Sequence, residues 1–417
     1  MTDEPRSLTR TAWLVVALLF PVALLNYMDR QLLAVMKFSV MGDISDIGTD
    51  ANWGRMLGQF KWVYAFCSPI GGYIADRFSR RLTICGSLFA WSAITWITGQ
   101  VHSYEALLWT RSLMGVSEAF YIPAALALIA DYHRGGTRSR AVGVHQIAIY
   151  CGVIIGGFAG HVAEAPHLGW RWAFDVCGII GVIYTLPLIQ WLRDAPQAPA
   201  SEAAPKISAF PATKELLRNP SFILLLLVFT LPAMAAWVVR DWMPAILKDQ
   251  FAIGQGTAGV TASLYWQLAA IGGALVGGWL ADRRMRRGNR GRIHVSAIGI
   301  SLIIPALFGV GNAGSLVVAA AFLALFGFGW GFFDANNMPI LTQIVRPELR
   351  ATGYGVMNLV SMTCGGMADW GFGYLRDRAV PLNVTLGLFA LIPVVSIVFL
   401  LCIRPRPELG ADSHRSA

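Results

Sequence analysis

The sequence repeats itself across its two halves. The segment Gly72-Tyr-Ile-Ala-Asp-Arg77 reappears as Gly278-Trp-Leu-Ala-Asp-Arg283, each time after a long apolar stretch. A second set of matches runs in step with the first and pairs the residues Gly115, Arg138, Gly143 and Val144 with Gly327, Arg350, Gly355 and Val356. Chance matching of small apolar residues is a poor explanation, because a charged Asp-Arg pair stands at the same place in both copies. Two tandem copies of a hydrophobic half are typical of membrane transporters with parallel repeats.

The composition indicates a chain that lies mostly in a membrane. It is 55% hydrophobic and 14% charged, whereas soluble domains are about 25% charged. Twelve stretches are long and apolar enough to cross a hydrocarbon layer of about 30 Å, where only helices close their own backbone hydrogen bonds. We therefore predict an all-α membrane protein of twelve transmembrane helices in two six-helix, pseudo-symmetric bundles. The predicted spans are 11–36, 54–76, 82–100, 104–131, 139–162, 171–192, 220–247, 257–281, 294–312, 315–343, 351–375 and 382–403.

A segment rich in Ala and Pro separates the two halves. This linker, 193–219, divides a predicted N-terminal bundle, 1–192, from a C-terminal bundle with a short tail, 220–417. Most Lys and Arg fall between spans on the side of the termini, so the positive-inside rule predicts a multi-pass protein of the cell inner membrane with both termini cytoplasmic. The net charge of +9 follows from this bias and from contact with anionic membrane lipid. No nucleic-acid partner is expected.

The sequence contains no motif that indicates an enzyme or a cofactor. Its six cysteines are scattered through predicted helices without metal-ligand spacing, so we interpret them as packing residues. It has no phosphate-binding loop, dinucleotide fingerprint or nucleophile elbow. We expect a monomer that uses a gradient as its energy source and needs neither cofactor nor metal.

Charges inside the predicted spans need a physical reason. Each costs about 2.5–3.5 kcal/mol at the centre of a spanning helix and is therefore a functional candidate. The first half contributes Asp29, Arg30, Arg111 and Glu118. The last two share one helix face about 10 Å apart, which leaves room for a ligand or for a charge from another helix. A fixed cation beside a titratable acid suits transport of an anion with a proton, and a salt-bridge network that only fixes packing is the alternative. The role of Arg240-Asp241, in the second half, stays open.

Polar side chains on several predicted helices are candidates to line the same cavity. They are Asn26, Tyr27, Tyr121, His145, Gln146, Tyr150, Asn336 and Asn337. The histidine titrates near physiological pH, although a histidine inside a membrane helix serves as often in hydrogen bonds between helices. The two adjacent asparagines have the same pair of interpretations, ligand contact or inter-helix hydrogen bonding.

The repeated Asp-Arg turns are candidate gates. Asp76 ends the second predicted span and is followed by Arg77 and Arg81, and the second copy supplies Asp282 and Arg283. A carboxylate in this place can pair with the positive N-terminus of a neighbouring helix and with nearby arginines. Such contacts would hold the cytoplasmic side shut. Charge that only sets the topology is the alternative.

Taken together, these motifs resemble a known family over the whole chain. The segment 72–81 and its copy 278–287 resemble the signature of the major facilitator superfamily. Three further motifs are similar to its anion:cation symporter branch, which carries hexuronates, aldonates, sulfonates and other small carboxylates with protons. They are Asn26-Tyr-Met-Asp-Arg30, Arg111 with Gly115 and Glu118, and Gly169-Trp-Arg-Trp-Ala-Phe174.

The resemblance implies a role for each central charge. Asp29 and Glu118 would be proton sites, and Arg30 and Arg111 would hold the carboxylate. The expected function is proton-coupled symport of a small organic anion by alternating access. Spinster-like transporters share the same charges, so a lysophospholipid or sphingolipid transporter is the alternative. A membrane sensor or scaffold is disfavoured, because no soluble signalling domain is evident and the intramembrane charges would serve nothing.

Overall fold

The computed structural model describes residues 6–133, 137–195 and 209–406, and within these ranges the chain is helical with no strand. Apolar composition explains the helices, and polar caps explain where several of them begin. The helices of the first half are α1 (Arg6–Val35), α2 (Lys37–Asp43), η1 (Ser45–Ile47), α3 (Asp50–Arg77), α4 (Arg80–Thr98), α5 (Tyr104–Glu118), α6 (Tyr121–Tyr132), α7 (Arg138–Gly157), α8 (Ala159–Glu164) and α9 (Gly169–Trp191).

The second half repeats this series with fewer breaks. It comprises α10 (Ala209–Leu217), α11 (Pro220–Phe251), α12 (Gln255–Met285), α13 (Gly291–Gly311), α14 (Leu316–Ile344), η4 (Pro347–Leu349), α15 (Arg350–Asp377) and α16 (Leu382–Cys402). The N-cap of α5 is Ser103, whose side chain accepts from the Ala106 N–H, and the N-cap of α14 is Ser315, whose side chain accepts from the Val318 N–H. These serines occupy corresponding places in the two halves, so even a helix start is duplicated.

Twelve membrane-spanning segments emerge from these elements, as the sequence predicted. Within the described residues, nine of them have the length and apolar composition of a membrane span. The other three, α3, α4 and α15, are of spanning length but more polar. The fourth span is made of α5 and α6 with a short break at Ala119 and Phe120, and the fifth is made of α7 and α8. The all-α, twelve-helix fold is therefore confirmed.

The contacts divide the chain into two compact units. The first unit comprises Met1–Ala198 and Asp241–Ser263, and the second unit comprises Pro199–Arg240 and Leu264–Ala417. Helices α11 and α12 thus contribute to both units, which hydropathy alone does not reveal. Much of the predicted linker 193–219 lies outside the described residues, and the predicted domain limits stay a prediction.

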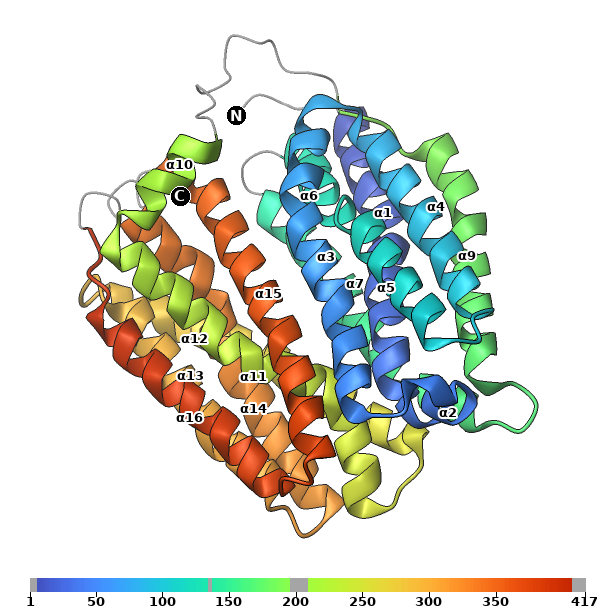
Figure 1. Cartoon of the computed structure of the whole chain (residues 1–417). Coiled ribbons are helices and arrows are strands. Elements are labelled where there is room, and N and C mark those ends of the chain that lie inside the picture. Colours follow the sequence, from blue (N-terminus) through green and yellow to red (C-terminus); the bar gives the residue numbers. More distant parts are fainter. Residues whose placement is uncertain (1–5, 134–136, 196–208, 407–417) are drawn as a thin grey trace. The chain divides into compact units, whose positions relative to one another are not determined.

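Corresponding helices pack in corresponding ways inside each unit. In the first unit α4 packs on α5 and on α9, and in the second unit α13 packs on α14 and on α16 (Figure 1). The pairs α4–α9 and α13–α16 are the third and sixth spans of their halves. The sequence repeat is therefore also a repeat of helix packing.

Glycines make the closest of these repeated contacts. A Cβ added at Gly71 would lie 2.5 Å from the carbonyl oxygen of Ala119, and one added at Gly277 would lie 2.7 Å from Cα of Phe332. Both approaches join the second span of a half to its fourth span. A glycine on one of the two helices permits this approach because it has no Cβ at the point of contact, as in other small-residue contacts between membrane helices.

The same pair of spans makes a second matched contact. A Cβ at Gly115 would lie 2.8 Å from the Phe60 carbonyl oxygen, and one at Gly327 would lie 2.2 Å from the Trp266 carbonyl oxygen. Gly72 and Gly278, which begin the two sequence motifs, have no neighbour within 4 Å of an added Cβ. Close packing therefore accounts for Gly71 and Gly277, which directly precede the two motifs, but it does not account for the first glycine of each motif.

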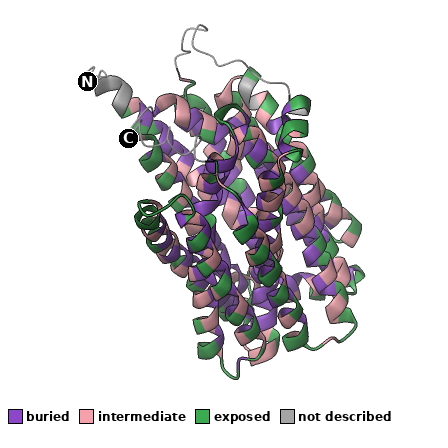
Figure 2. Cartoon of the chain, turned by 90° about the vertical axis from the view of Figure 1, so that its left-hand side faces the viewer, coloured by how far each residue is buried: buried purple, intermediate pink, exposed green. Residues whose placement is uncertain are grey.

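Outward-facing positions on the helices carry large apolar side chains. Figure 2 shows that individual helices carry both buried and exposed residues. Many of the exposed residues are apolar, including Phe66, Leu186, Leu275 and Val317. Surfaces of this kind are a liability in water and are the expected surface toward hydrocarbon.

We predict that Gly71→Ala and Gly277→Ala lower the melting temperature of the purified protein, because the added methyl group meets backbone atoms that cannot move aside. The matched controls Gly72→Ala and Gly278→Ala should melt at the wild-type temperature or slightly above it, because their methyl groups meet no atom within 4 Å and Ala favours a helix over Gly. Equal melting temperatures for all four variants would contradict this account of the repeat.

Candidate substrate and proton site

The centre of the first unit holds an ion pair between α1 and α5. Arg30 Nε donates to Glu118 Oε2 at 2.6 Å, the Glu118 side chain is fully buried, and 8% of the Arg30 side chain is exposed. Glu118 is the last residue of α5, directly before the break that leads into α6. Two of the four charges selected from the sequence therefore neutralise each other. A pair desolvated to this degree holds together strongly once formed, because either charge alone would be costly.

Three aromatic rings surround the guanidinium of Arg30. Its Cζ lies 4.8 Å from the ring centroid of Tyr27, 5.0 Å from that of Phe60 and 4.9 Å from that of Tyr64. Cation–π attraction of this kind strengthens when water is excluded. The rings hold Arg30 in place from α1 and α3, so its position does not depend on Glu118 alone.

Asp29 and Arg111 form the second part of the cluster. Thr95 of α4 donates a hydrogen bond to Asp29. Arg111 Nη2, on α5, lies 3.4 Å from the hydroxyl oxygen of Thr98, which is also on α4. Asp29 and Arg111 carry opposite charges and both contact threonines of α4, and the Arg111 guanidinium lies 5.9 Å from the ring centroid of Phe174. The sequence analysis left room beside Arg111 and Glu118 for a ligand or for a charge from another helix, and Arg30 of α1 is such a charge on Glu118.

Several buried polar atoms of the cluster have no hydrogen-bond partner within the described residues. They are Nδ2 and Oδ1 of Asn26, Oδ1 of Asp29, Nη2 of Arg30, Nε of Arg111 and Oε1 of Glu118. Buried polar groups are normally satisfied, and leaving one unsatisfied costs about 1–3 kcal/mol. Both donors and acceptors are available here, so the cluster can accept a proton on one side and an anionic group on the other.

Tyr121 and His145 belong to the core of the first unit. A hydrogen bond of 3.0 Å joins the Tyr121 hydroxyl to His145 Nε2, and the same hydroxyl donates to the Leu19 carbonyl at 3.3 Å. Trp91 packs edge-on against Tyr121 with ring centroids 5.4 Å apart. These contacts join α1, α4, α6 and α7. They agree with the interpretation of His145 as a residue that forms hydrogen bonds between helices, and substrate contact by Tyr121 or His145 stays a prediction.

The remaining cavity candidates are spread over α7 and α14. Gln146 is half-buried, and half-buried Tyr150 packs against the same core as Tyr121. In the second unit, Asn336 Nδ2 donates to the Phe332 carbonyl of its own helix at 2.8 Å. Asn336 Oδ1 and both side-chain polar atoms of Asn337 are buried without a partner in the described part of the chain. The asparagine patch therefore has free hydrogen-bonding capacity.

The two Asp-Arg turns share a stacking arrangement. The Arg77 guanidinium lies 4.4 Å from the ring centroid of Tyr73, and the Arg283 guanidinium lies 5.6 Å from that of Trp279. Asp282 accepts from Arg292 of α13 at 3.3 Å but is well exposed.

Other contacts at these turns do not involve the repeated carboxylates. The Arg81 backbone N–H donates to Asp194 at 2.8 Å, and the Arg81 side chain donates to the Ile189 carbonyl. The side chain of Asp76 lies outside the described residues, so the gate assigned to it stays a prediction.

Lys61 was not selected from the sequence although it lies inside the second predicted span. In the structure it is buried on α3, directly after Phe60, and forms an ion pair with Asp241 of α11. Asp241, whose role the sequence analysis left open, thus has an ion-pair partner on α3. The sequence could have identified Lys61 as a site residue, because a lysine inside a predicted span requires an opposite charge.

The Gly169–Phe174 motif fixes the end of the first unit that lies away from the start of α1 (Figure 1). Gly169 has a φ of 75°, in the left-handed region that glycine adopts without strain. Trp170 Nε1 donates to Asp43 Oδ2 at 3.0 Å, and Arg171 contacts the same oxygen at 2.8 Å. Arg171 also donates to the carbonyls of Gly99 and Val101 at 2.9 and 2.6 Å. The motif thus ties α2 and the α4–α5 turn to α9.

Comparisons with known sequences agree on the family. A family model described as Major Facilitator Superfamily matches residues 19–368. Protein spinster homolog 1 of Xenopus tropicalis is 30% identical over 397 residues, covering 87% of this chain and 71% of that protein. The human protein of the same name is 30% identical over 398 residues, covering 88% and 73%. An MFS-type efflux pump of Mycolicibacterium smegmatis is 29% identical over 374 residues, covering 88% and 85%.

Solved structures show the same fold. A bacterial homologue of the human lysosomal transporter Spinster, in an inward-facing and unoccupied conformation, matches with a TM-score of 0.76 at 20% identity over 97% of both chains. A D-xylose–proton symporter matches with a TM-score of 0.75 at 16% identity, over 95% of this chain and 98% of that one. At these identities the likeness concerns the fold alone.

We predict that Arg30→Met lowers the melting temperature strongly, because it leaves the Glu118 carboxylate buried without its counter-charge, a loss of about 3–5 kcal/mol. The double variant Arg30→Met/Glu118→Gln should recover much of this loss, which a double-mutant cycle of melting temperatures would measure. The exposed Glu105→Gln serves as control. Strictly additive effects of the two substitutions would show that the ion pair contributes nothing to stability.

Proposed function

The chain belongs to the Major Facilitator Superfamily, and we propose that it is a proton-coupled secondary transporter of a molecule with an anionic group. The observation that carries this proposal is the buried Arg30–Glu118 pair, in which each partner keeps an unsatisfied polar atom. A pair that only fixed helix packing would be expected to satisfy both groups completely.

The pair couples a proton to an anion by competition for Arg30. A proton on Glu118 removes the negative charge that holds the guanidinium, so Arg30 becomes free to attract the anionic group of a substrate. An anion on Arg30 in turn removes the cation that keeps Glu118 ionised, and the carboxylate then takes up a proton more readily. Each ligand therefore favours the binding of the other, by the same factor in both directions.

Asp29 and Arg111 supply a second acid and a second cation. The Arg111 guanidinium offers several N–H donors in a fixed plane, which suits two-point contact with a carboxylate, sulfonate or phosphate oxygen pair. Asn26 places an amide with two unsatisfied atoms among the same residues. In the proposal Arg111 binds the anionic group together with Arg30, and Asp29 is a further proton site.

Two classes of substrate fit this chemistry. A sugar acid, carboxylate or sulfonate is the class that the anion:cation symporter resemblance implies. A lysophospholipid or sphingolipid is the class implied by the Spinster-like resemblance, and it is favoured by the Spinster relatives at 30% identity. The aromatic rings around Arg30 offer apolar contact beside the cation, which suits an amphiphile better than a fully polar sugar acid.

The orientation in the membrane is part of the same proposal. The protein is a multi-pass membrane transporter, and the excess of basic residues on the side of the termini supports termini in the cytoplasm. The Asp-Arg turns then face the cytoplasm, where we propose that Asp76 and Asp282 help to hold that side shut.

Glu118→Gln should abolish uphill uptake driven by a proton gradient yet retain exchange of substrate across the membrane, because the permanently neutral side chain no longer carries the coupling proton. Reconstituted vesicles with and without an imposed pH gradient measure both activities in one preparation. Glu105→Gln, an exposed carboxylate on the same helix, is the matched control. Full accumulation by Glu118→Gln would assign the coupling proton to another group.

The two substrate classes are distinguished by ligand-induced changes in melting temperature. Sugar acids, sulfonates and lysophospholipids should be compared at equal concentrations, and we expect the lysophospholipids to stabilise the wild type. Arg111→Lys should lose most of that stabilisation while its ligand-free melting temperature stays near that of the wild type, because a lysine does not reproduce two-point contact. Unchanged ligand stabilisation in Arg111→Lys would make Arg111 a structural counter-charge.

A further inference from the structure

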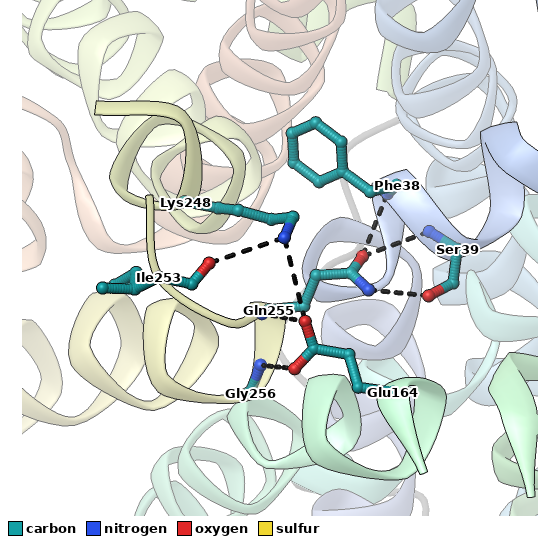
Figure 3. Close-up of polar contacts among 7 residues, drawn as sticks. All are labelled: Phe38, Ser39, Glu164, Lys248, Ile253, Gln255 and Gly256. Atoms are coloured by element: carbon teal, nitrogen blue, oxygen red, sulfur yellow. Dashed lines mark hydrogen bonds and ion pairs between the residues drawn. The ribbon is translucent and has the colours of Figure 1, made fainter. Parts of the chain in front are cut away.

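The end of α11, the start of α12 and the turn between them make their contacts with the first unit. We call the segment Asp241–Ser263 the strap, because it groups with the first unit although the helices on either side of it continue into the second unit. Its contacts with α2 and α8 are drawn in Figure 3. Topology puts the strap on the side of the membrane opposite the termini, since it follows an odd number of crossings.

The first fastening is a helix cap supplied by a distant residue. Glu164, at the end of α8, accepts from the backbone N–H of Gln255 at 2.6 Å with one oxygen and from that of Gly256 at 3.2 Å with the other (Figure 3). These N–H groups open α12 and have no partner within their own helix. Lys248 of the strap lies 3.8 Å from the same carboxylate. Glu164 thus caps a helix to which it does not belong.

The second contact is a helix cap that the strap supplies to α2. The Gln255 side-chain oxygen accepts from the backbone N–H groups of Phe38 and Ser39 at 3.0 and 3.2 Å, and its nitrogen donates to the Ser39 hydroxyl at 2.6 Å (Figure 3). Phe38 and Ser39 lie in the first turn of α2, which begins at Lys37, so their N–H groups also lack partners in their own helix. The strap therefore caps α2 while α8 caps the strap, and we call these two contacts the reciprocal caps.

Small residues bring the strap close enough for both caps. A Cβ added at Gly160 would lie 2.5 Å from the Gln255 carbonyl carbon, and one added at Gly256 would lie 2.1 Å from Nδ1 of His161. The surfaces of α8 and the strap are thus in direct contact. The other partner, α2, is itself held by the Asp43 contacts of the Gly169–Phe174 motif, so the first unit presents a fixed docking place.

We propose that the strap leaves this place and returns to it in every transport cycle, and that the reciprocal caps set how often it does so. The inference rests only on the chain being a transporter, which must open to each side of the membrane in turn. Gln255 takes part in both caps, so departure of the strap breaks both together. A third of the Glu164 side chain is exposed, so water can replace the lost hydrogen bonds, which makes the contact reversible.

Amide hydrogen exchange of the full-length protein tests whether the strap moves as one piece. Gln255→Ala should speed exchange at Phe38 and Ser39, and Glu164→Ala should speed exchange at Gln255 and Gly256, each by roughly fivefold for a lost cap. The decisive result is the cross effect: Glu164→Ala should also speed exchange at Phe38 and Ser39, which Glu164 does not touch. Acceleration confined to the directly capped amides would overturn the proposal, because each cap would then open by itself and the strap would not move as one piece.

Matched controls are available on the same side of the membrane. Glu105→Ala removes an exposed carboxylate from the first turn of α5. Gln100→Ala removes a glutamine whose side chain donates to Asp175 of α9, in the same unit, at 2.6 Å. Neither control should change exchange in the strap or in α2.

A reversible cross-link tests whether departure of the strap is needed for transport. The close approach of Gly256 to the His161 ring brings the two Cβ positions within the range that a disulfide spans. His161→Cys/Gly256→Cys should therefore lose nearly all transport on oxidation and regain it on reduction. The two single-cysteine variants control for oxidation of the native thiols. Undiminished transport by the fully cross-linked protein would show that the strap need not leave.

Discussion

A charge surrounded by hydrocarbon needs a counter-charge or a set of hydrogen bonds, and this requirement organises the first unit. Arg30 meets it through Glu118 and three aromatic rings, and Lys61 meets it through Asp241. Phe60 and Tyr64 of α3 contact Arg30, while Lys61 between them reaches α11. One turn of α3 therefore lies next to the proposed coupling pair and also holds the first residue of the strap.

Packing is duplicated in this protein, but the chemistry is not. Gly115 and Gly327 make matched backbone contacts, and Ser103 and Ser315 start matched helices. The counterparts of Arg111 and Glu118 in the second half are Leu323 and Trp330, which pack in apolar surroundings. These backbone contacts and helix starts are thus present in both halves, whereas the charges of Arg111 and Glu118 are replaced by apolar side chains in the second.

The polar contacts of the first unit differ in how easily they can be exchanged for water. The Arg30–Glu118 and Lys61–Asp241 pairs are buried between spans, so separating them requires a proton or another ion to replace the lost partner. The reciprocal caps lie at helix ends, and Glu164 is partly exposed. Water can take over these hydrogen bonds directly. The interior pairs are therefore suited to sensing ligands, and the caps are suited to opening and closing.

Much of the fold was determined by the sequence alone, because the bilayer permits few alternatives. Uninterrupted apolar length fixes a helix wherever water is absent, and all twelve predicted spans agree closely with helices in the structure. The repeat also indicated that matched helices would pack alike. Intramembrane charge identified Asp29, Arg30, Arg111 and Glu118 as a group, since each is costly in hydrocarbon whatever its neighbours are.

Only the tertiary structure decided which of these charges meet. The spacing of Arg111 and Glu118 left open whether a ligand or a charge from another helix would lie near them, and the structure shows that Glu118 binds Arg30 of α1. Asp241 needed a partner on another helix, and periodicity within one helix cannot reveal it. The caps exchanged by Glu164 and Gln255 are likewise invisible in sequence. A cap supplied by a distant segment depends on where two helix ends meet in space, and no local pattern of residues records that position.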